Sequence, residues 1–209
     1  MPIEPQNAAE RRLVARIPKG GPVNVGTKRG RATIRATLIR DICLNPDAYG
    51  VPARGLRIAR ALVKKQLDLH SGSLERPLEF SDCKFDEPVD LTDARVRTVT
   101  FGGCEIPGIS AGGLRVDGDL YIESSKVLGE VSLMGARVEG LLNCAGTKLE
   151  NPDGPALSAD RIETGGSIFL RGGFTAKGAV RLPGANIGGD LSCSGATLEN
   201  PDGNALHAD

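Results

Sequence analysis

Apolar residues return at short, regular intervals from residue 56 to the end of the chain. The repeated unit reads apolar, any residue, apolar, any two residues, small, any residue, apolar, as in residues 131–138 (VSLMGARV) and 142–149 (LNCAGTKL). Units with this pattern start at positions 56, 67, 78, 89, 99, 109, 120, 131, 142, 155, 168, 180, 191 and 204. Such self-similarity predicts one structural unit that stacks along an axis.

Each unit is expected to form two very short strands with a corner between them. Two apolar residues separated by one other residue lie on the same face of an extended strand, and the residues that follow, often Gly or polar, turn the chain. Two units make one four-sided coil of about 21 to 26 residues. An aromatic content of 3%, without Trp, suits a narrow coil filled with aliphatic side chains. The pattern therefore predicts an all-β fold, a parallel β-helix.

A longer repeat of 49 residues is built from four of these units. Residues 138–154 (VEGLLNCAGTKLENPDG) return as residues 187–203 (IGGDLSCSGATLENPDG). Pro fixes one turn dihedral and Gly tolerates a positive φ, so both Asn-Pro-Asp-Gly segments predict loops. We expect the two loops to project from the same side of the molecule, two coils apart.

The unit resembles the pentapeptide-repeat pattern, in which a small residue precedes a central apolar residue by two positions. The resemblance is carried by residues 83–85 (CKF), 94–96 (ARV), 104–106 (CEI) and 196–198 (ATL). It implies a right-handed, four-sided parallel β-helix. This chain departs from the strict period of five because it inserts an extra residue about once per unit.

Small residues should stack in two inward columns, since identical positions two units apart lie at the strand spacing of ~4.8 Å. One column is expected to hold Ala61, Cys83, Cys104, Ser125, Thr147, Gly173 and Ala196. The other is expected to hold Gly72, Ala94, Leu114, Ala136, Asp160 and Ala185. Leu114 and Asp160 are not small, and they predict a bulge or a widened corner.

Full burial is predicted for four leucines and inward placement for four of the five cysteines. The leucines are Leu133, Leu142, Leu182 and Leu191. The cysteines at positions 83, 104, 144 and 193 should behave as small, reduced hydrophobic residues, and Cys43 lies outside the template. An odd number of cysteines does not predict a disulfide framework.

Two amphipathic helices are predicted in residues 1–55. Residues 7–17 read as a short helix stopped by Pro18, and residues 19–31 (KGGPVNVGTKRGR) as a basic, Gly-rich linker. Residues 32–44 place Ile34, Leu38 and Ile42 one helical turn apart. Such a helix could contact a membrane surface or nucleic acid, but covering the open end of a β-helix is the favoured role.

Residues 56–69 (LRIARALVKKQLDL) fit two patterns. Their composition suits a helix, yet they match the coil template in register with the later units. Helix propensity is a weak prior, so this segment is predicted to be the first coil. The chain is accordingly divided into residues 1–55, a basic helical arm or cap, and residues 56–209, the β-helix.

Charge is divided unequally between these two parts. Residues 1–55 hold ten Lys or Arg and four Asp or Glu, a net +6, and residues 56–209 hold 16 and 22, a net −6. A basic arm on an acidic body is compatible with peripheral membrane contact through the N-terminal region, and equally with two portions that simply neutralise each other. The chain has no run of 18 apolar residues and no apolar core near its N-terminus, so a cytoplasmic location is expected.

No catalytic, cofactor-binding or metal-binding residue is predicted. The two histidines, His70 and His207, are not near a patterned nucleophile or carboxylate pair, and no Gly-rich phosphate-binding motif follows a strand. The acidic loops at residues 150–153 and 199–202 should lie two coils apart, roughly 9 to 10 Å. That separation is too large for the loops to share a calcium ion.

A second resemblance covers nearly the whole chain. The basic helical N-terminus, followed by residues 77–109 and 184–203, resembles a bacterial family often labelled membrane-associated oxidoreductase. The label implies a flavin or nicotinamide site, and the resemblance supplies no residue for one.

Three functions remain open from the sequence. The favoured one is a non-enzymatic rigid scaffold or protein-interaction module with an unknown protein partner. The second is an acidic, DNA-mimic-like binder of a nucleic-acid-handling protein, as implied by the pentapeptide-repeat resemblance, although nucleic acid itself is not an expected partner. The third is the oxidoreductase that the family label implies.

The last residues align with the middle of the preceding repeat. Asp209 aligns with Asp160, so the template is unfinished at the C-terminal end. An unfinished coil exposes backbone donors, acceptors and apolar side chains. From this we expect a truncated β-helix that is a fragment of a longer protein, or two molecules that associate through their C-terminal coils.

Overall fold

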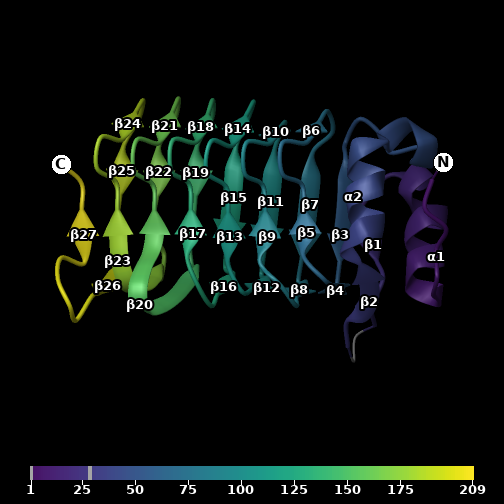
Figure 1. Cartoon of the computed structure of the whole chain (residues 1–209), viewed down its shortest axis with the longest axis horizontal. Coiled ribbons are helices and arrows are strands. Elements are labelled where there is room, and N and C mark those ends of the chain that lie inside the picture. The colour runs from purple at the N-terminus through teal and green to yellow at the C-terminus, as the bar shows by residue number, and fades with distance from the viewer. Residues whose placement is uncertain (1, 28–29) are drawn as a thin grey trace.

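The computed structural model describes residues 2–27 and 30–209 and shows a parallel β-helix of about seven turns with helices at its N-terminal end (Figure 1). Each complete turn has four faces, numbered here in the order in which the chain visits them from Leu56. Residues 28 and 29 of the predicted basic linker lie outside the described residues. The predicted fold class is confirmed.

The first and second faces are stacks of parallel strands. The first face contains β1 (Val23–Asn24), β3 (Leu56–Ala59), β7 (Leu78–Ser81), β11 (Val99–Gly102), β15 (Leu120–Glu123), β19 (Leu142–Asn143), β22 (Ile168–Phe169) and β25 (Leu191–Ser192). The second face contains β2 (Ala32–Arg35), β4 (Ala61–Lys64), β8 (Lys84–Phe85), β12 (Glu105–Ile106), β16 (Lys126–Val127), the first parts of β20 (Lys148–Ser158) and β23 (Thr175–Arg181), and β26 (Thr197–Glu199).

The third and fourth faces complete each turn. The third contains β5 (Leu67–Asp68), β9 (Val89–Asp90), β13 (Ile109–Ser110), β17 (Val131–Ser132), the last parts of β20 and β23, and β27 (Leu206–His207). The fourth contains β6 (Ser73–Leu74), β10 (Arg95–Val96), β14 (Arg115–Val116), β18 (Arg137–Val138), β21 (Glu163–Thr164) and β24 (Asn186–Ile187), which lie in a row in Figure 1.

The register of the first face confirms the expected coil length. Its inward residues pair in the order Leu56, Leu78, Val99, Leu120, Leu142, Ile168 and Leu191. Successive turns therefore take 22, 21, 21, 22, 26 and 23 residues. Residues 56–69 form β3, β4 and β5, so the prediction of a first coil rather than a helix is confirmed.

The interior is a continuous aliphatic core with one aromatic cluster. Phe80 stacks on Phe101 with ring centroids 5.6 Å apart, and Phe85 meets Phe80 edge-on at 5.1 Å. Of the four leucines expected to be fully buried, Leu133, Leu142 and Leu182 are. The fourth, Leu191, is only half-buried because none of the described strands stacks on the open side of β25.

Two template units start later than the sequence suggested. Val131 pairs with Leu157, and Val180 pairs with Leu206, so the starts are 157 and 206 rather than 155 and 204. Each Asn-Pro-Asp-Gly loop absorbs two more residues than expected. As a result Ile162, not Asp160, occupies the inward column, and Asp160 lies at the corner, where it pairs with Arg181.

One further column position was wrong. Thr147 is followed in its column by Phe174 rather than Gly173, because Lys148 pairs with Thr175. Gly173 is an extra corner residue with a φ of +87°, a conformation that glycine adopts readily. Phe174 is fully buried, so the column tolerates a large ring at this level.

The predicted helix over residues 32–44 is a strand followed by a helix. Residues 32–35 form β2, which pairs in parallel with β4, and α2 spans Ala36–Leu44. Thr33 and Ile34 are β-branched and complete the sheet edge that β4 offers. The strand pairing outweighs the helical spacing of Ile34.

The helical elements lie at the N-terminal end of the coil (Figure 1). Helix α1 (Ala8–Arg16) is capped by Asn7, as residues 7–17 predicted, and short 3₁₀ turns follow at Ile17–Lys19 and Pro46–Tyr49. Helix α2 buries Leu38, Ile39 and Ile42, and it contacts β5.

A buried ion pair fastens α1 to β2. The Glu10 carboxylate is fully buried and accepts hydrogen bonds from the Arg35 backbone and from the Arg35 guanidinium, at 2.8 to 3.0 Å. Burial opposes ionisation of Glu10, but the bonds from Arg35 and from the Gln6 backbone outweigh it and lower the pKa of this carboxyl. Removing Arg35 would leave the fully buried Glu10 carboxylate as an unpaired, desolvated charge.

Candidate interaction surface

Three arginines form a column on the outer surface of the fourth face. Arg95 pairs with Arg115, and Arg115 pairs with Arg137, on the adjacent parallel strands β10, β14 and β18. The following residue of each strand is a buried valine, and alternation along a strand therefore turns each arginine outward. We call residues 95, 115 and 137 the arginine ladder.

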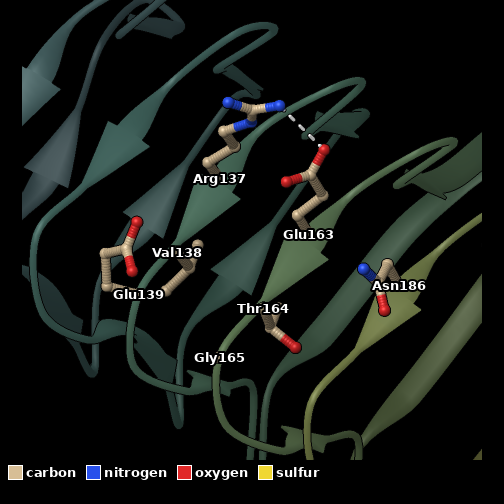
Figure 2. A pocket seen from close by; sticks show the side chains of 7 residues that line it. All are labelled: Arg137, Val138, Glu139, Glu163, Thr164, Gly165 and Asn186. Carbon is tan, nitrogen blue, oxygen red and sulfur yellow. Dashed lines mark hydrogen bonds and ion pairs between the residues drawn. The ribbon is translucent and has the colours of Figure 1, made fainter.

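The outer members of the arginine ladder hold carboxylates of their own chain. Arg95 Nη2 lies 3.1 Å from Asp117 Oδ1, and Arg137 Nη2 lies 3.0 Å from Glu163 Oε1 (Figure 2). The central Arg115 is exposed, and its guanidinium makes no ion pair or hydrogen bond with the described residues. The ladder therefore carries one uncompensated charge at its centre.

Two shallow hollows follow the arginine ladder across the strands. The first, of about 350 Å³, is lined by Arg95, Arg115, Val116, Asp117, Arg137 and Glu139. The second, of about 240 Å³, extends from Arg137 and Glu139 past Glu163 to Asn186 (Figure 2). Arg137 and Glu139 line both hollows, so together these form one groove along the axis of the β-helix.

At the far end of this groove, the backbones of two successive turns pack closely at Gly165. A Cβ atom at Gly165 would lie 2.1 Å from the carbonyl oxygen of Glu139, closer than real contacts allow. Glycine at this corner lets the two turns approach, and it leaves the groove without a side chain there. A larger residue at position 165 would push the coils apart.

Elsewhere on the surface, most ion pairs join one coil to the next. Arg181 lies 2.8 Å from Asp160, and its hydrogen bond lowers the pKa of that carboxyl. Lys126 does the same for Glu150. Further pairs of this kind are Arg57–Glu79, Lys64–Asp86 and Lys84–Glu105. Exposed pairs contribute little stability, and opposite charges on adjacent strands favour one register.

Four of the five cysteines are buried, and Cys193 is half-buried. Cys83 and Cys104 are neighbours in one inward column, as expected from the template. A hydrogen bond with Cys83, together with burial, raises the pKa of Cys104, and burial raises the pKa of Cys43 and of Cys144 to about 12. Thiols of this kind are poor nucleophiles.

One histidine and one acidic loop residue each have a side-chain partner of their own. His207 lies 2.7 Å from Asp209, and the loop acid Glu150 pairs with Lys126. Among residues 2–27 and 30–209, no three His, Cys, Asp or Glu side chains are grouped to hold a metal ion. None of the described helices is long and apolar enough to cross a bilayer.

In the sequence, the three arginines of the ladder are identifiable only as separate residues, not as a paired column. Arg95, Arg115 and Arg137 all follow the small position of their units, but the pairing that leaves Arg115 free depends on side-chain geometry. No family model, curated protein or solved structure matches the chain.

Proposed function

We propose that the protein is a non-enzymatic, rigid scaffold that binds another protein through its outer faces. The observation that carries this proposal is the register of the coils, which holds outward side chains in fixed columns along one continuous core. A surface built on ordered strands loses little backbone conformational entropy when a partner binds, and such preorganisation favours affinity.

The DNA-mimic alternative is less well supported by the arrangement of charge. A mimic of duplex DNA needs lines of carboxylates at the spacing of phosphates. On the fourth face the column contains arginines, and on the second face Lys84, Glu105 and Lys126 alternate in sign. These columns favour a protein partner with mixed or acidic character.

A second contact is proposed for the N-terminal region, in line with a cytoplasmic protein that touches a membrane surface. Arg11, Arg16 and Lys19 are exposed, and no ion pair within the described residues neutralises them. Anionic lipid attracts exposed basic side chains by about 1 kcal/mol each. Co-sedimentation with vesicles that contain phosphatidylserine, compared with neutral vesicles, tests this contact.

The scaffold proposal is tested by photo-crosslinking in the source cell. A photoreactive amino acid is placed at Thr100 on the first face, Ser110 on the third face or Arg97 on the fourth face. We expect one face to crosslink to one defined protein, confirmed by a reciprocal experiment. Absence of a crosslinked protein at all three positions would overturn the proposal.

Purification of the native protein separates the scaffold from the oxidoreductase reading. We expect no flavin absorbance and no bound nicotinamide nucleotide by mass spectrometry. A cofactor bound at one equivalent per chain would establish the oxidoreductase alternative instead.

A further inference from the structure

We infer that the arginine ladder is the docking surface for a carboxylate-bearing segment of the protein partner. This inference rests on the proposed scaffold function and adds the place and the chemistry of the contact. The partner segment would lie in the groove along the β-helix axis and would place a Glu or Asp carboxylate on Arg115.

The first argument is the charge left over on the fourth face. Like charges directly opposite one another on adjacent strands destabilise a sheet, and the ladder places three arginines on adjacent strands whose backbones are ~4.8 Å apart. Asp117 and Glu163 compensate Arg95 and Arg137, whereas Arg115 is uncompensated. An incoming anion would relieve the repulsion within the ladder.

The second argument identifies the anion. Both outer arginines already hold a carboxylate, and a single nitrogen, Arg95 Nη2, donates to both oxygens of Asp117, at 3.1 and 3.4 Å. The planar guanidinium presents five N–H donors whose geometry matches carboxylate oxygens. The chain itself therefore shows that a carboxylate fits the outer positions, and Arg115 has the same orientation on its strand.

Glu139 is the natural competitor for Arg115. Asp117 lies two residues beyond the residue that stacks on Arg95, and Glu139 lies two residues beyond the residue that stacks on Arg115. Glu139 lines the same hollow, yet it forms no ion pair with the described residues. Its negative charge beside the hollow would repel and compete with a partner carboxylate, so removing the charge of Glu139 should strengthen binding.

The groove also limits the shape of the partner. Arg95 and Arg137 are two strand spacings apart, roughly 10 Å, which about three residues of extended peptide span. A segment with two acidic residues within three or four positions would reach the central arginine and one neighbour. The rest of residues 56–209 carries net negative charge, so acidic segments would be repelled from other parts of the body.

The test uses fluorescence anisotropy of labelled peptides with the full chain at low salt. The probe is a Gly-Ser peptide with Glu at alternate positions, compared with matched peptides that carry Gln, Lys or phosphoserine at those positions. We expect the Glu peptide to bind, with affinity that falls as salt rises. Arg115→Gln should weaken binding by about three- to fivefold, the effect of one exposed charged contact.

Matched variants separate a specific site from general attraction. Arg54→Gln removes an exposed arginine near the N-terminal end and should leave the affinity nearly unchanged. Glu139→Gln should tighten binding, whereas Glu199→Gln, on the second face, should not. Thermal unfolding followed by circular dichroism would confirm that each variant is folded.

Three results would overturn the inference: equal effects of Arg115→Gln and Arg54→Gln, equal binding of the Glu and Lys peptides, or tenfold tighter binding of the phosphoserine peptide. The last would assign the ladder to phosphate. A crosslinked partner on the first or third face, without peptide binding, would refute the docking inference and leave the scaffold proposal standing. Peptide binding without any crosslinked partner would refute the scaffold proposal and leave the arginine ladder as a carboxylate-binding site.

Discussion

The two copies of the 49-residue repeat have nearly the same sequence and different surroundings. In the first copy, Leu142 and Leu157 are fully buried, because β22 and β23 stack on them. In the second copy the equivalent Leu191 is half-buried and Leu206 is 39% exposed. The comparison teaches that an inward position is defined by the template, but its burial is completed by the following coil.

One hydrogen bond within the loop is the same in both copies. The Asn151 amide donates to the carbonyl of Pro155 at 2.7 Å, and the Asn200 amide donates to the carbonyl of Asn204 at 2.9 Å. This side-chain hydrogen bond is therefore local, although the first loop also lies within β20, which pairs with β23 of the following coil. The stability of each coil comes from its neighbours, as in other solenoids.

The largest difference between the copies is expected from a charge placed in the core. Leu142→Asp should abolish cooperative folding, because it removes a buried side chain worth about 1.5 to 3 kcal/mol and desolvates a carboxylate. Leu191→Asp should leave a folded protein, since water reaches this position. Urea denaturation followed by circular dichroism measures both, and a soluble Leu142→Asp protein with an unchanged midpoint would refute the comparison.

A glycine beneath the first loop sharpens the comparison further. Gly178 has a φ of +114°, and a Cβ atom there would lie 2.3 Å from the carbonyl oxygen of Asn151. Gly178→Ala should cost about 1 to 3 kcal/mol of unfolding free energy from backbone strain, with the clash added to it. Gly203→Ala is the control, since a Cβ there approaches no atom closer than 3.6 Å. Equal midpoints for the two variants would contradict this account.

Thiol reactivity should report the same difference without a mutation. Cys144 is buried, and its pKa is raised from 9.0 to about 12, whereas its equivalent Cys193 is half-buried. In native protein, a maleimide should label Cys193 first and Cys144 only after unfolding, as mass spectrometry of the peptides would show. Preferential native labelling of Cys83 or Cys104 would contradict their inward placement.

The raised thiol pKa also predicts an alkaline limit. Because the pKa of Cys144 is higher in the folded state than its ordinary value of 9.0, its contribution to stability is present below pH 9. That contribution is lost as pH rises from 9 toward about 12. A Cys144→Ala variant should lose less stability than the wild type over this interval in urea titrations.

The smallest difference is expected at the end of each repeat. Asp160 pairs with Arg181, and the equivalent Asp209 pairs with His207. Asp160→Asn should cost about 0.5 to 1 kcal/mol and Asp209→Asn less than about 0.5 kcal/mol in unfolding free energy. The lowered pKa of Asp160 means that its contribution is lost as pH falls, so the two variants should converge in acid.

The local sequence pattern was enough to predict the strands on each face of the coil. It predicted the wrong register where the chain inserts extra residues. The spacing of Leu56 and Ile58 identified β3, because strands of this fold repeat the same alternation. Near Leu157 the template fits the sequence better from Pro155, which puts Ile162 at an apolar position, and only the pairing with Val131 shows that the unit starts at Leu157. Ile34 fitted a helix equally well, and the free edge of β4 decided otherwise.

The candidate surface was harder to predict from the sequence than the fold was. Arg95, Arg115 and Arg137 share one template position, which is a readable signal for a column. The free guanidinium of Arg115 depends on rotamers and on which carboxylate each neighbour reaches. Those choices are made by contacts between coils, and no periodicity encodes them.

The loop between Glu150 and Leu157 adds residues to its coil without changing the register of the strands on either side. Leu149 and Leu157 keep their places opposite Val127 and Val131, although the path between them is longer than in the preceding coils. Extra residues at this corner leave every other coil where it was. The exposed tip of this corner is therefore a permissive insertion site: a tag or a small domain placed between Pro152 and Asp153 would project from the β-helix and leave the inward columns on either side in register.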